Sequence, residues 1–222
     1  MKRNAFTMLE LVMVIIVLGI LAALAIPRLD RDLKQEAADN ILSAIRYTQH
    51  LALLDNKHKF DNPKWHQRFW HITFSTCTGT DRYYMIGSDD NMSNSSNAFF
   101  SQNEAALDPA NGKPYFWTNG TACGSGTDTS SASPSIFLSK KYGIDSITAG
   151  GGCSNTSANL GHIGFDHLGR PHVGFSTSTK PDYSSYMHNQ CQFTFSLKNG
   201  ESFTIKIEPE TGYAYIDGYE DS

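Results

Sequence analysis

The chain has 222 residues, enough for one domain of moderate size and a membrane anchor, and its length gives no reason to expect two domains. Charged residues make up 18% of the chain and hydrophobic residues 40%, which excludes both a disordered polyelectrolyte and a protein with many membrane spans. The formal net charge is -4, and a mildly acidic chain does not attract nucleic acid through its overall charge.

The N-terminal segment contains a long apolar run. It covers residues 6–26, with Glu10 as its one ionisable residue, and Lys2 and Arg3 precede it. A helix of this length, at about 1.5 Å per residue, spans the roughly 30 Å of a bilayer core. The two basic residues predict a cytoplasmic N-terminus and a body outside the cytoplasm.

Glu10 distinguishes this run from three simpler kinds of segment. A secretory signal peptide has a shorter apolar region, followed by a small-x-small cleavage site. A helix buried in a soluble protein is disfavoured because the run is apolar on every side. A plain membrane anchor leaves Glu10 unexplained, since a carboxylate deep in lipid costs about 2.5 kcal/mol or more and usually marks function.

Glu10 lies within the stretch Ala5-Phe6-Thr7-Met8-Leu9-Glu10-Leu11-Val12. This stretch resembles the prepilin motif of type IV pilins and type II secretion pseudopilins. The resemblance implies that a prepilin peptidase cuts between Ala5 and Phe6 on the cytoplasmic side and methylates the new N-terminal Phe6. The chain departs from the family pattern at Ala5, where family members nearly always have glycine.

The same resemblance implies an assembly role for Glu10. The new N-terminal amine and the Glu10 carboxylate have opposite charges, and each alone is costly in an apolar medium. Pairing them between neighbouring subunits would set the register of one subunit against the next. Pro27 lies where pilins often have a helix-kinking proline, which removes one helical hydrogen bond.

Residues 28–56 are predicted to continue the helix and to end near Asp55-Asn56. Apolar residues recur at three- and four-residue spacing, with charged residues mostly between them. The apolar set is Leu29, Leu33, Ala37, Ile41, Ala44, Ile45 and Ala52. This stripe predicts a helix face that packs on a globular domain.

Beyond residue 65 the pattern becomes that of short β-strands, several of which alternate apolar with polar residues. The predicted strands are residues 70–76, 83–87, 135–138, 164–165, 173–175, 192–197, 202–207 and 213–216. Lys198-Asn199-Gly200-Glu201 predicts a hairpin with a type I′ turn, because Asn-Gly suits positive φ angles. Glu210-Thr211-Gly212 predicts a second turn before the last strand.

All four cysteines, Cys77, Cys123, Cys153 and Cys191, lie beyond the apolar run. None forms a CxxC pair, and outside the cytoplasm an even number of cysteines favours disulfides, with three pairings open. A zinc site is the alternative, disfavoured because structural zinc sites usually contain a short Cys/His pair. Residues 88–97 and 120–134 are predicted surface loops, the second tethered through Cys123.

The C-terminal part shows a second resemblance, to GspH/FimT-type minor pseudopilins. It is carried by residues 163–171, by the Phe-rich hairpin that follows and by residues 210–213. Some FimT-like pilins bind DNA through a G-R-x-R pattern, but the matching stretch here, residues 212–215, has no arginine and has acidic neighbours. DNA is therefore not an expected partner. Lys140, Lys141 and Lys198 are a few basic residues that could still contact it.

Polar clusters elsewhere favour neither a metal site nor catalysis. The histidines His162, His167 and His172 recur every five residues near Asp166, a spacing that aligns side chains on neither a helix nor a strand. Residues 89–91, Asp-Asp-Asn, lack the pattern of a calcium-binding EF-hand loop. No phosphate loop, nucleophile elbow or metalloprotease helix is present, so no enzyme and no cofactor are expected.

The elements in chain order predict an α+β, pilin-like fold: a long N-terminal helix packed on an antiparallel sheet. The expected parts are a leader (1–5), a transmembrane segment (6–27), an amphipathic helix (28–56) and a β-rich domain outside the cytoplasm (57–222). The resemblances imply a structural minor pilin or pseudopilin of a type II secretion or type IV pilus filament. The implied partners are prepilin peptidase, other pilin subunits and the inner membrane. The alternatives are a DNA-binding minor pilin and a surface-adhesive pilin.

Overall fold

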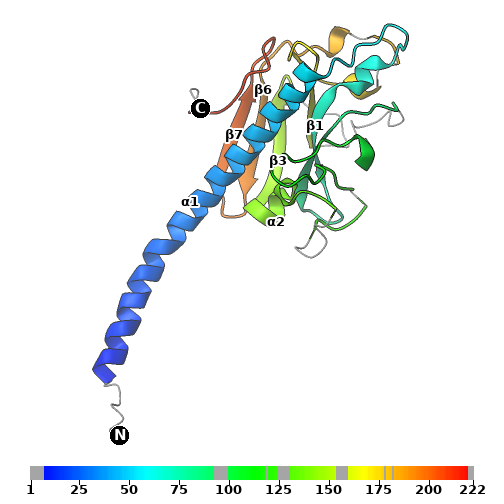
Figure 1. Ribbon diagram of the computed structural model, residues 1–222. Coiled ribbons are helices and arrows are strands. Elements are labelled where there is room, and N and C mark those ends of the chain that lie inside the picture. The colour runs from blue at the N-terminus through cyan, green and yellow to red at the C-terminus, as the bar shows by residue number, and fades with distance from the viewer. Residues whose placement is uncertain are drawn as a thin grey trace.

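A computed structural model describes residues 8–92, 100–118, 120–124, 131–153, 160–177, 179–181 and 183–219, with the backbone alone for residues 22–32. One long helix, α1 (Met8–Leu54), leaves a body built from two antiparallel sheets (Figure 1). The protein is therefore an α+β protein with antiparallel sheets, as its sequence predicts. The predicted cleavage site at Ala5 and Phe6 lies outside the described residues.

Each sheet has four strands. The strands are β1 (Trp70–Thr76), β2 (Arg82–Gly87), β3 (Ile144–Gly151), β4 (Gly161–Phe165), β5 (Pro171–His172), β6 (Cys191–Leu197), β7 (Ser202–Ile207) and β8 (Ala214–Ile216). The first sheet has the order β2-β1-β4-β5 and the second β3-β6-β7-β8, with every pair antiparallel. A short helix, α2 (Leu138–Tyr142), and the 3-10 turns Trp65–Arg68, Gln102–Glu104, Pro134–Ile136, Phe175–Thr177 and Tyr183–Ser185 complete the body.

The C-terminal half of α1 packs across both sheets, where it contacts β1, β2 and β4 of one and β7 and β8 of the other. The predicted stripe is buried at Ala37, Ile41, Ala44, Ile45 and Ala52. Leu33 is 38% exposed and lies at the edge of the body near Tyr142 and Leu197, and the side chain of Leu29 is outside the described ones. The helix runs without a break through Pro27 and curves gradually along its length (Figure 1).

Aromatic side chains join the two sheets. The ring of Phe74 in β1 lies 5.0 Å from that of Phe193 and 5.4 Å from that of Phe195, both in β6. Gly161 permits this approach, because a Cβ atom there would lie 2.5 Å from the Phe193 ring. Burying each of these phenylalanines stabilises the body by about 1.5–3 kcal/mol, so the interface between the sheets is a main source of stability.

Two predicted strands are not strands in the structure, and two strands, β3 and β5, were not predicted. Residues 135–138 form the end of a 3-10 turn and the start of α2, because Ser133 caps Ser135 N–H and Pro134 occupies the first helical position. Residues 173–175 are not a strand, since Gly174 has a φ of 69° and a 3-10 turn follows. The edge strand β3, rich in glycine and with a register shift near its start, was not predicted.

The hairpin between β6 and β7 has a different turn from the one predicted. Gly200 N–H donates to Leu197 O at 3.0 Å, and Leu197 N–H donates to Glu201 O at 2.8 Å. Gly200 has a φ of 87°, whereas Asn199 is not among the residues with positive φ. The turn is thus a three-residue loop that ends in a left-handed glycine, and not a type I′ turn.

The four cysteines form two disulfides, Cys77–Cys123 and Cys153–Cys191. This result selects one of the three open pairings and overturns the zinc alternative for these residues. The first bridge ties the predicted loop at Cys123 to the end of β1, and the second joins the end of β3 to the start of β6. Both bridges therefore fasten an exposed connection to a sheet.

Candidate assembly segment

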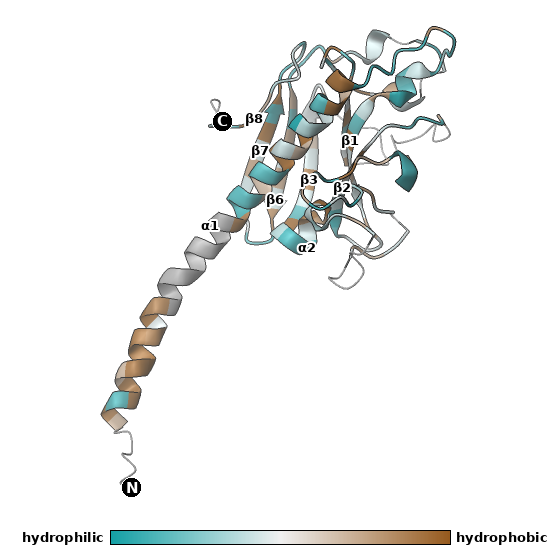
Figure 2. Ribbon diagram, in the orientation of Figure 1, coloured by the Kyte–Doolittle hydropathy of each residue, from teal (hydrophilic) through white to brown (hydrophobic). Residues whose placement is uncertain are grey.

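The N-terminal part of α1 stands clear of the body, and its described residues are mostly hydrophobic (Figure 2). Every residue from 8 to 21 is exposed, and the large apolar side chains among them are between 50% and 88% exposed. Glu10 is the acidic residue of the first helical turn. We call residues 8–21 the projecting segment.

An exposed apolar surface of this kind is thermodynamically unfavourable in water. Fully burying one leucine, isoleucine, valine or methionine side chain is worth about 1.5–3 kcal/mol, so covering the exposed part of each contributes roughly 1 kcal/mol. Monomeric soluble proteins rarely expose contiguous apolar patches beyond a few hundred Å². The projecting segment therefore has the properties of an association surface.

Among the described residues, no helix combines the length and apolar composition needed to cross a membrane. The predicted transmembrane segment, residues 6–27, lies only partly within them, because Phe6 and Thr7 and the side chains of residues 22–27 are outside.

Gln49 fastens the body half of α1 to two turns from distant parts of the chain. Its Nε2 donates to Gly169 O and to Thr211 O, each at 2.8 Å. A Cβ atom at Gly212 would lie 2.5 Å from Gly169 O, so glycine is needed for the two turns to meet. The two stretches that carry the second resemblance thus lie side by side against the helix, and Arg46 adds a bond of 2.9 Å to Ala214 O.

Asp166 organises the first of these turns. Its Oδ1 accepts from the N–H groups of Leu168 and Arg170 at 2.9 Å, and its Oδ2 lies 2.6 Å from the Arg170 guanidinium and 3.5 Å from His172 Nε2. Burial opposes ionisation of this carboxyl, but the hydrogen bonds from His172, Arg170 and the backbone outweigh it and hold its pKa well below the usual range. The Asp166 carboxylate therefore stabilises this turn.

The three histidines of the sequence pattern do not converge. His172 lies beside Asp166, whereas the His167 ring stacks near that of His58 at 6.3 Å and His162 packs on Phe175 at 5.5 Å. Burial, with His71 nearby, lowers the pKa of His162 to about 4. Across the described ranges, no group of three or more histidine, cysteine or acidic side chains could hold a metal ion.

In the acidic loop at residues 89–91, the carboxylate of Asp90 forms ion pairs with two basic side chains. The Asp90 carboxylate lies 3.0 Å from Lys57 Nζ and 2.9 Å from Arg68 Nη2. Burial raises the pKa of Asp90, but the hydrogen bonds and charges of Lys57 and Arg68 outweigh it and lower the pKa overall. This arrangement favours a structural ion-pair cluster over a calcium site.

Two of the three lysines considered as a basic alternative are paired with acids. Lys140 Nζ lies 3.1 Å from Asp81, and Lys141 Nζ lies 3.4 Å from Glu36. In the C-terminal stretch, the rings of Tyr213 and Tyr215 stack at 5.7 Å. Each ion pair reduces the positive charge that these lysines could offer to a phosphate backbone. That the protein does not bind DNA stays a prediction, and these ion pairs favour it.

Sequence reasoning missed two features. Gln49 lies four residues after Ile45 on the buried stripe, and a polar residue at an apolar position was the signal that could have identified its bridging role. The aromatic residues Phe116 and Trp117, which line a cavity, had no such signal because their partners come from other segments.

Comparison of the chain with family models, with curated proteins and with solved structures gives no match.

Proposed function

We propose that the protein is a minor subunit of a pilin-like filament, of the kind built by type IV pilus or type II secretion machines. The observation that carries the proposal is the projecting segment: a helix apolar on every side, leaving a well-packed body, with a carboxylate in its first turn. Such a segment needs an apolar environment all around it, and a bundle of identical helices provides one.

In this proposal the first part of α1 occupies two apolar environments, one after the other. Before assembly, residues 6–27 lie in the inner membrane with the body outside the cytoplasm. After removal of residues 1–5, the same segment packs among the helices of neighbouring subunits. Glu10 pairs there with the new amine of Phe6 on an adjacent subunit, and the pair is strong because the surroundings are apolar.

Three observations support this function beside the projecting segment. The motif around Glu10 resembles the prepilin motif. The two disulfides suit a compartment outside the cytoplasm, where such bonds persist. The two C-terminal turns that resemble minor pseudopilins come together on α1 through Gln49, so the resemblance involves residues that are also structurally linked.

The proposal is tested with Glu10→Gln, which removes the charge and keeps the shape of the side chain. Expressed in the native host, this variant should reach the membrane and lose its leader but be depleted at least about tenfold from the sheared filament fraction, since a charge pair in apolar surroundings is lost. Quantitative immunoblotting of the membrane and filament fractions measures the ratio.

The matched control is Glu36→Gln, on the same helix but paired with Lys141 at the surface of the body. It should enter filaments like the wild type, because exposed ion pairs contribute little. Normal assembly of Glu10→Gln would contradict the proposal. So would a mature chain that still begins at Met1, as mass spectrometry would detect.

A further inference from the structure

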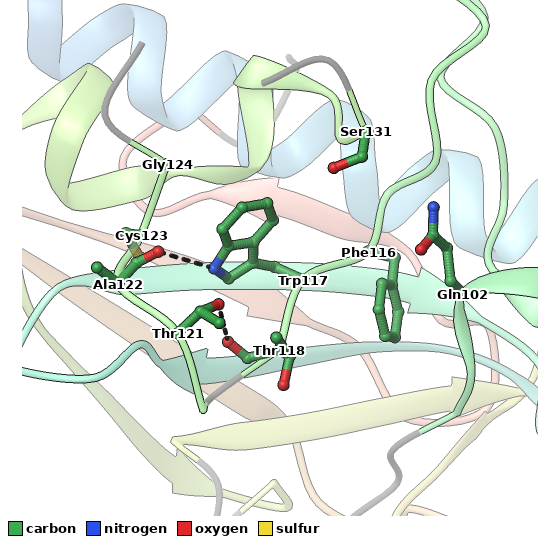
Figure 3. Close-up of a pocket in the computed structure, with 9 residues that line it drawn as sticks. All are labelled: Gln102, Phe116, Trp117, Thr118, Thr121, Ala122, Cys123, Gly124 and Ser131. Carbon is green, nitrogen blue, oxygen red and sulfur yellow. Dashed lines mark hydrogen bonds between the residues drawn. The ribbon is translucent and has the colours of Figure 1, made fainter. Parts of the chain in front are cut away.

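The body contains a cavity of about 360 Å³ on the side of the first disulfide, remote in sequence from the projecting segment (Figure 3). The described residues that line it include the aromatic Phe116 and Trp117 and the polar Gln102, Thr118, Thr121 and Ser131. The volume falls within the range of small-molecule sites, roughly 300–1,000 Å³. Nothing in the filament proposal uses this cavity.

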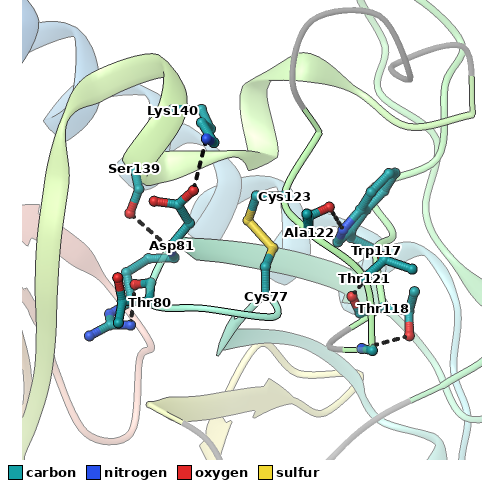
Figure 4. The surroundings of a disulfide bond; sticks show 12 residues. Cys77, Thr80, Asp81, Trp117, Thr118, Thr121, Ala122, Cys123, Ser139 and Lys140 are labelled. Atoms are coloured by element: carbon teal, nitrogen blue, oxygen red, sulfur yellow. Dashed lines mark hydrogen bonds and ion pairs between the residues drawn. A yellow bond between two sulfur atoms is a disulfide. The ribbon is translucent and has the colours of Figure 1, made fainter.

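Described residues of the loop that carries the Trp117 ring are bonded to one another and to the end of β1 (Figure 4). Trp117 Nε1–H donates to Ala122 O at 3.2 Å, and Thr78 N–H donates to Thr121 O at 2.9 Å. The Cys77–Cys123 disulfide fastens the end of the loop to the sheet. A site that is rigid before binding loses less entropy when a ligand enters, so this construction favours recognition.

The Trp117 ring is also fixed from the side. The Phe137 ring meets it edge-on, with centroids 5.0 Å apart and planes at 85°. The Phe116 ring lies near that of Phe100, with centroids 6.1 Å apart and planes tilted by 52°. Two aromatic rings in fixed orientations therefore border one cavity.

The polar lining restricts the chemistry of the ligand. Beside the two aromatic rings, the described lining residues carry uncharged hydroxyl and amide groups. The Thr121 hydroxyl donates to Thr118 O and the Thr118 hydroxyl accepts from Gly120 N–H, and each keeps further hydrogen-bonding capacity. The fitting ligand is neutral, with one apolar face and several hydroxyl groups.

We propose that this cavity binds a neutral sugar residue of a glycan. The C–H face of the sugar ring packs on an aromatic ring, whose electron-rich face attracts the polarised C–H groups. Gln102, Ser131 and the two threonines then hydrogen-bond to the sugar hydroxyls. The proposal is independent of filament assembly, since it concerns only the body.

The test uses the full chain, with its disulfides intact, in micelles of a detergent that has no sugar headgroup. Glucose, galactose, N-acetylglucosamine and their disaccharides are the probes, and saturation-transfer NMR measures binding. At least one probe should bind saturably with a Kd on the order of 1 mM. Trp117→Ala should weaken that binding at least about tenfold, because the stacking surface is lost.

Gln102→Ala provides a second variant that spares the packing, since Gln102 is exposed. It should weaken binding about threefold to tenfold, the value of a hydrogen bond or two. Phe60→Ala is the matched control, because it removes an aromatic ring that is 95% exposed elsewhere on the body. It should bind the sugar like the wild type, and so should Glu10→Gln.

Three results would overturn the proposal. One is the absence of saturable binding of every probe at about 50 mM, far above the expected Kd. Another is unchanged affinity in both Trp117→Ala and Gln102→Ala. The third is Trp117-dependent binding of phenol or indole with no binding of any sugar, which would make the cavity an apolar aromatic site.

Discussion

The two halves of α1 have the same backbone structure and opposite surroundings. In the body half, Ala37, Ile41 and Ile45 are completely buried, and polar residues occupy the other side of the helix. In the projecting segment, large apolar side chains are at least 50% exposed on all sides. One helix thus contains one part that packs within the body and one part that is exposed.

The apolar surface of the body half is buried against the two sheets, whereas that of the projecting segment is exposed. A stripe of apolar residues needs one apolar neighbour, which the two sheets provide. A helix that is apolar all round needs neighbours all round, which this chain alone cannot provide. Under the proposed function, the projecting segment is the part that depends on a membrane or on other subunits, and the body half is the part that anchors it.

Replacing matched isoleucines in the two halves gives the largest expected contrast. Ile45→Ala removes a fully buried side chain and should lower the free energy of unfolding of the body by about 4 kcal/mol, because it leaves a cavity. Ile16→Ala removes a side chain that is 51% exposed and should change that free energy by less than about 0.5 kcal/mol. Urea unfolding in detergent micelles, followed by near-ultraviolet circular dichroism, measures both.

Equal losses in the two variants would contradict the separation of tasks. The same pair should show the reverse order in the filament assay, where Ile16→Ala loses a contact between subunits.

Acid should weaken the body through His162, a smaller effect that leaves the projecting segment untouched. The pKa of this buried imidazole is about 4 in the folded chain, below its ordinary value of 6.5. Between these values the unfolded chain binds the proton more readily, so stability is complete above about pH 6.5 and falls by about 3 kcal/mol as the pH drops to 4. Urea titrations between pH 7 and 4 measure the loss.

His162→Gln should flatten this pH dependence, whereas His188→Gln, at an exposed position, should not. An unchanged slope in His162→Gln would show that another group is responsible. The pKa of Asp166 is also depressed, so this carboxylate acts in the same direction at lower pH: its stabilisation is present above its ordinary pKa of 3.8 and is lost below it.

The junction between helix and body gives the smallest expected effect. Gln49→Ala removes two hydrogen bonds and leaves Gly169 O and Thr211 O without this donor, so the body should lose about 2 kcal/mol. Gln35→Ala, on the exposed side of the same helix, removes one bond to Asp39 and should cost only a few tenths of a kcal/mol. Thermal unfolding compares them, and equal shifts would contradict the bridging role of Gln49.

Much of the fold was predictable where a local pattern suffices. The limits of β1 and β7 match the predicted segments, because both strands have apolar and β-branched residues between clear turns. The edge strand β3 was missed since its glycines and Asp145 are poor strand formers, and pairing with β6 overrides that preference. Residues 135–138 were misassigned because the Ser133-Pro134 helix start was taken as the end of the loop at residues 120–134, with a strand following it.

The features of the candidate sites likewise include some that the sequence predicts and some that it does not. The apolar run and Glu10 were predictable because their signal is contiguous. The disulfide pairing, the bridge at Gln49 and the cavity at Trp117 were not, since each joins residues that are far apart in the chain. The burial of His162 was equally hidden, because its neighbours His71 and Phe175 come from other elements.

The sequence by itself determined the long helix, its all-round apolar first part and the stripe of its second part, because helical periodicity is a local property. Only the tertiary structure decided which members of the stripe are buried, at Ala37, Ile41, Ala44, Ile45 and Ala52, and which cysteines pair. Only it brought Gly169, Gly212 and Gln49 into contact. These outcomes depend on how two sheets pack around shared aromatic rings, and no short stretch of sequence contains that information.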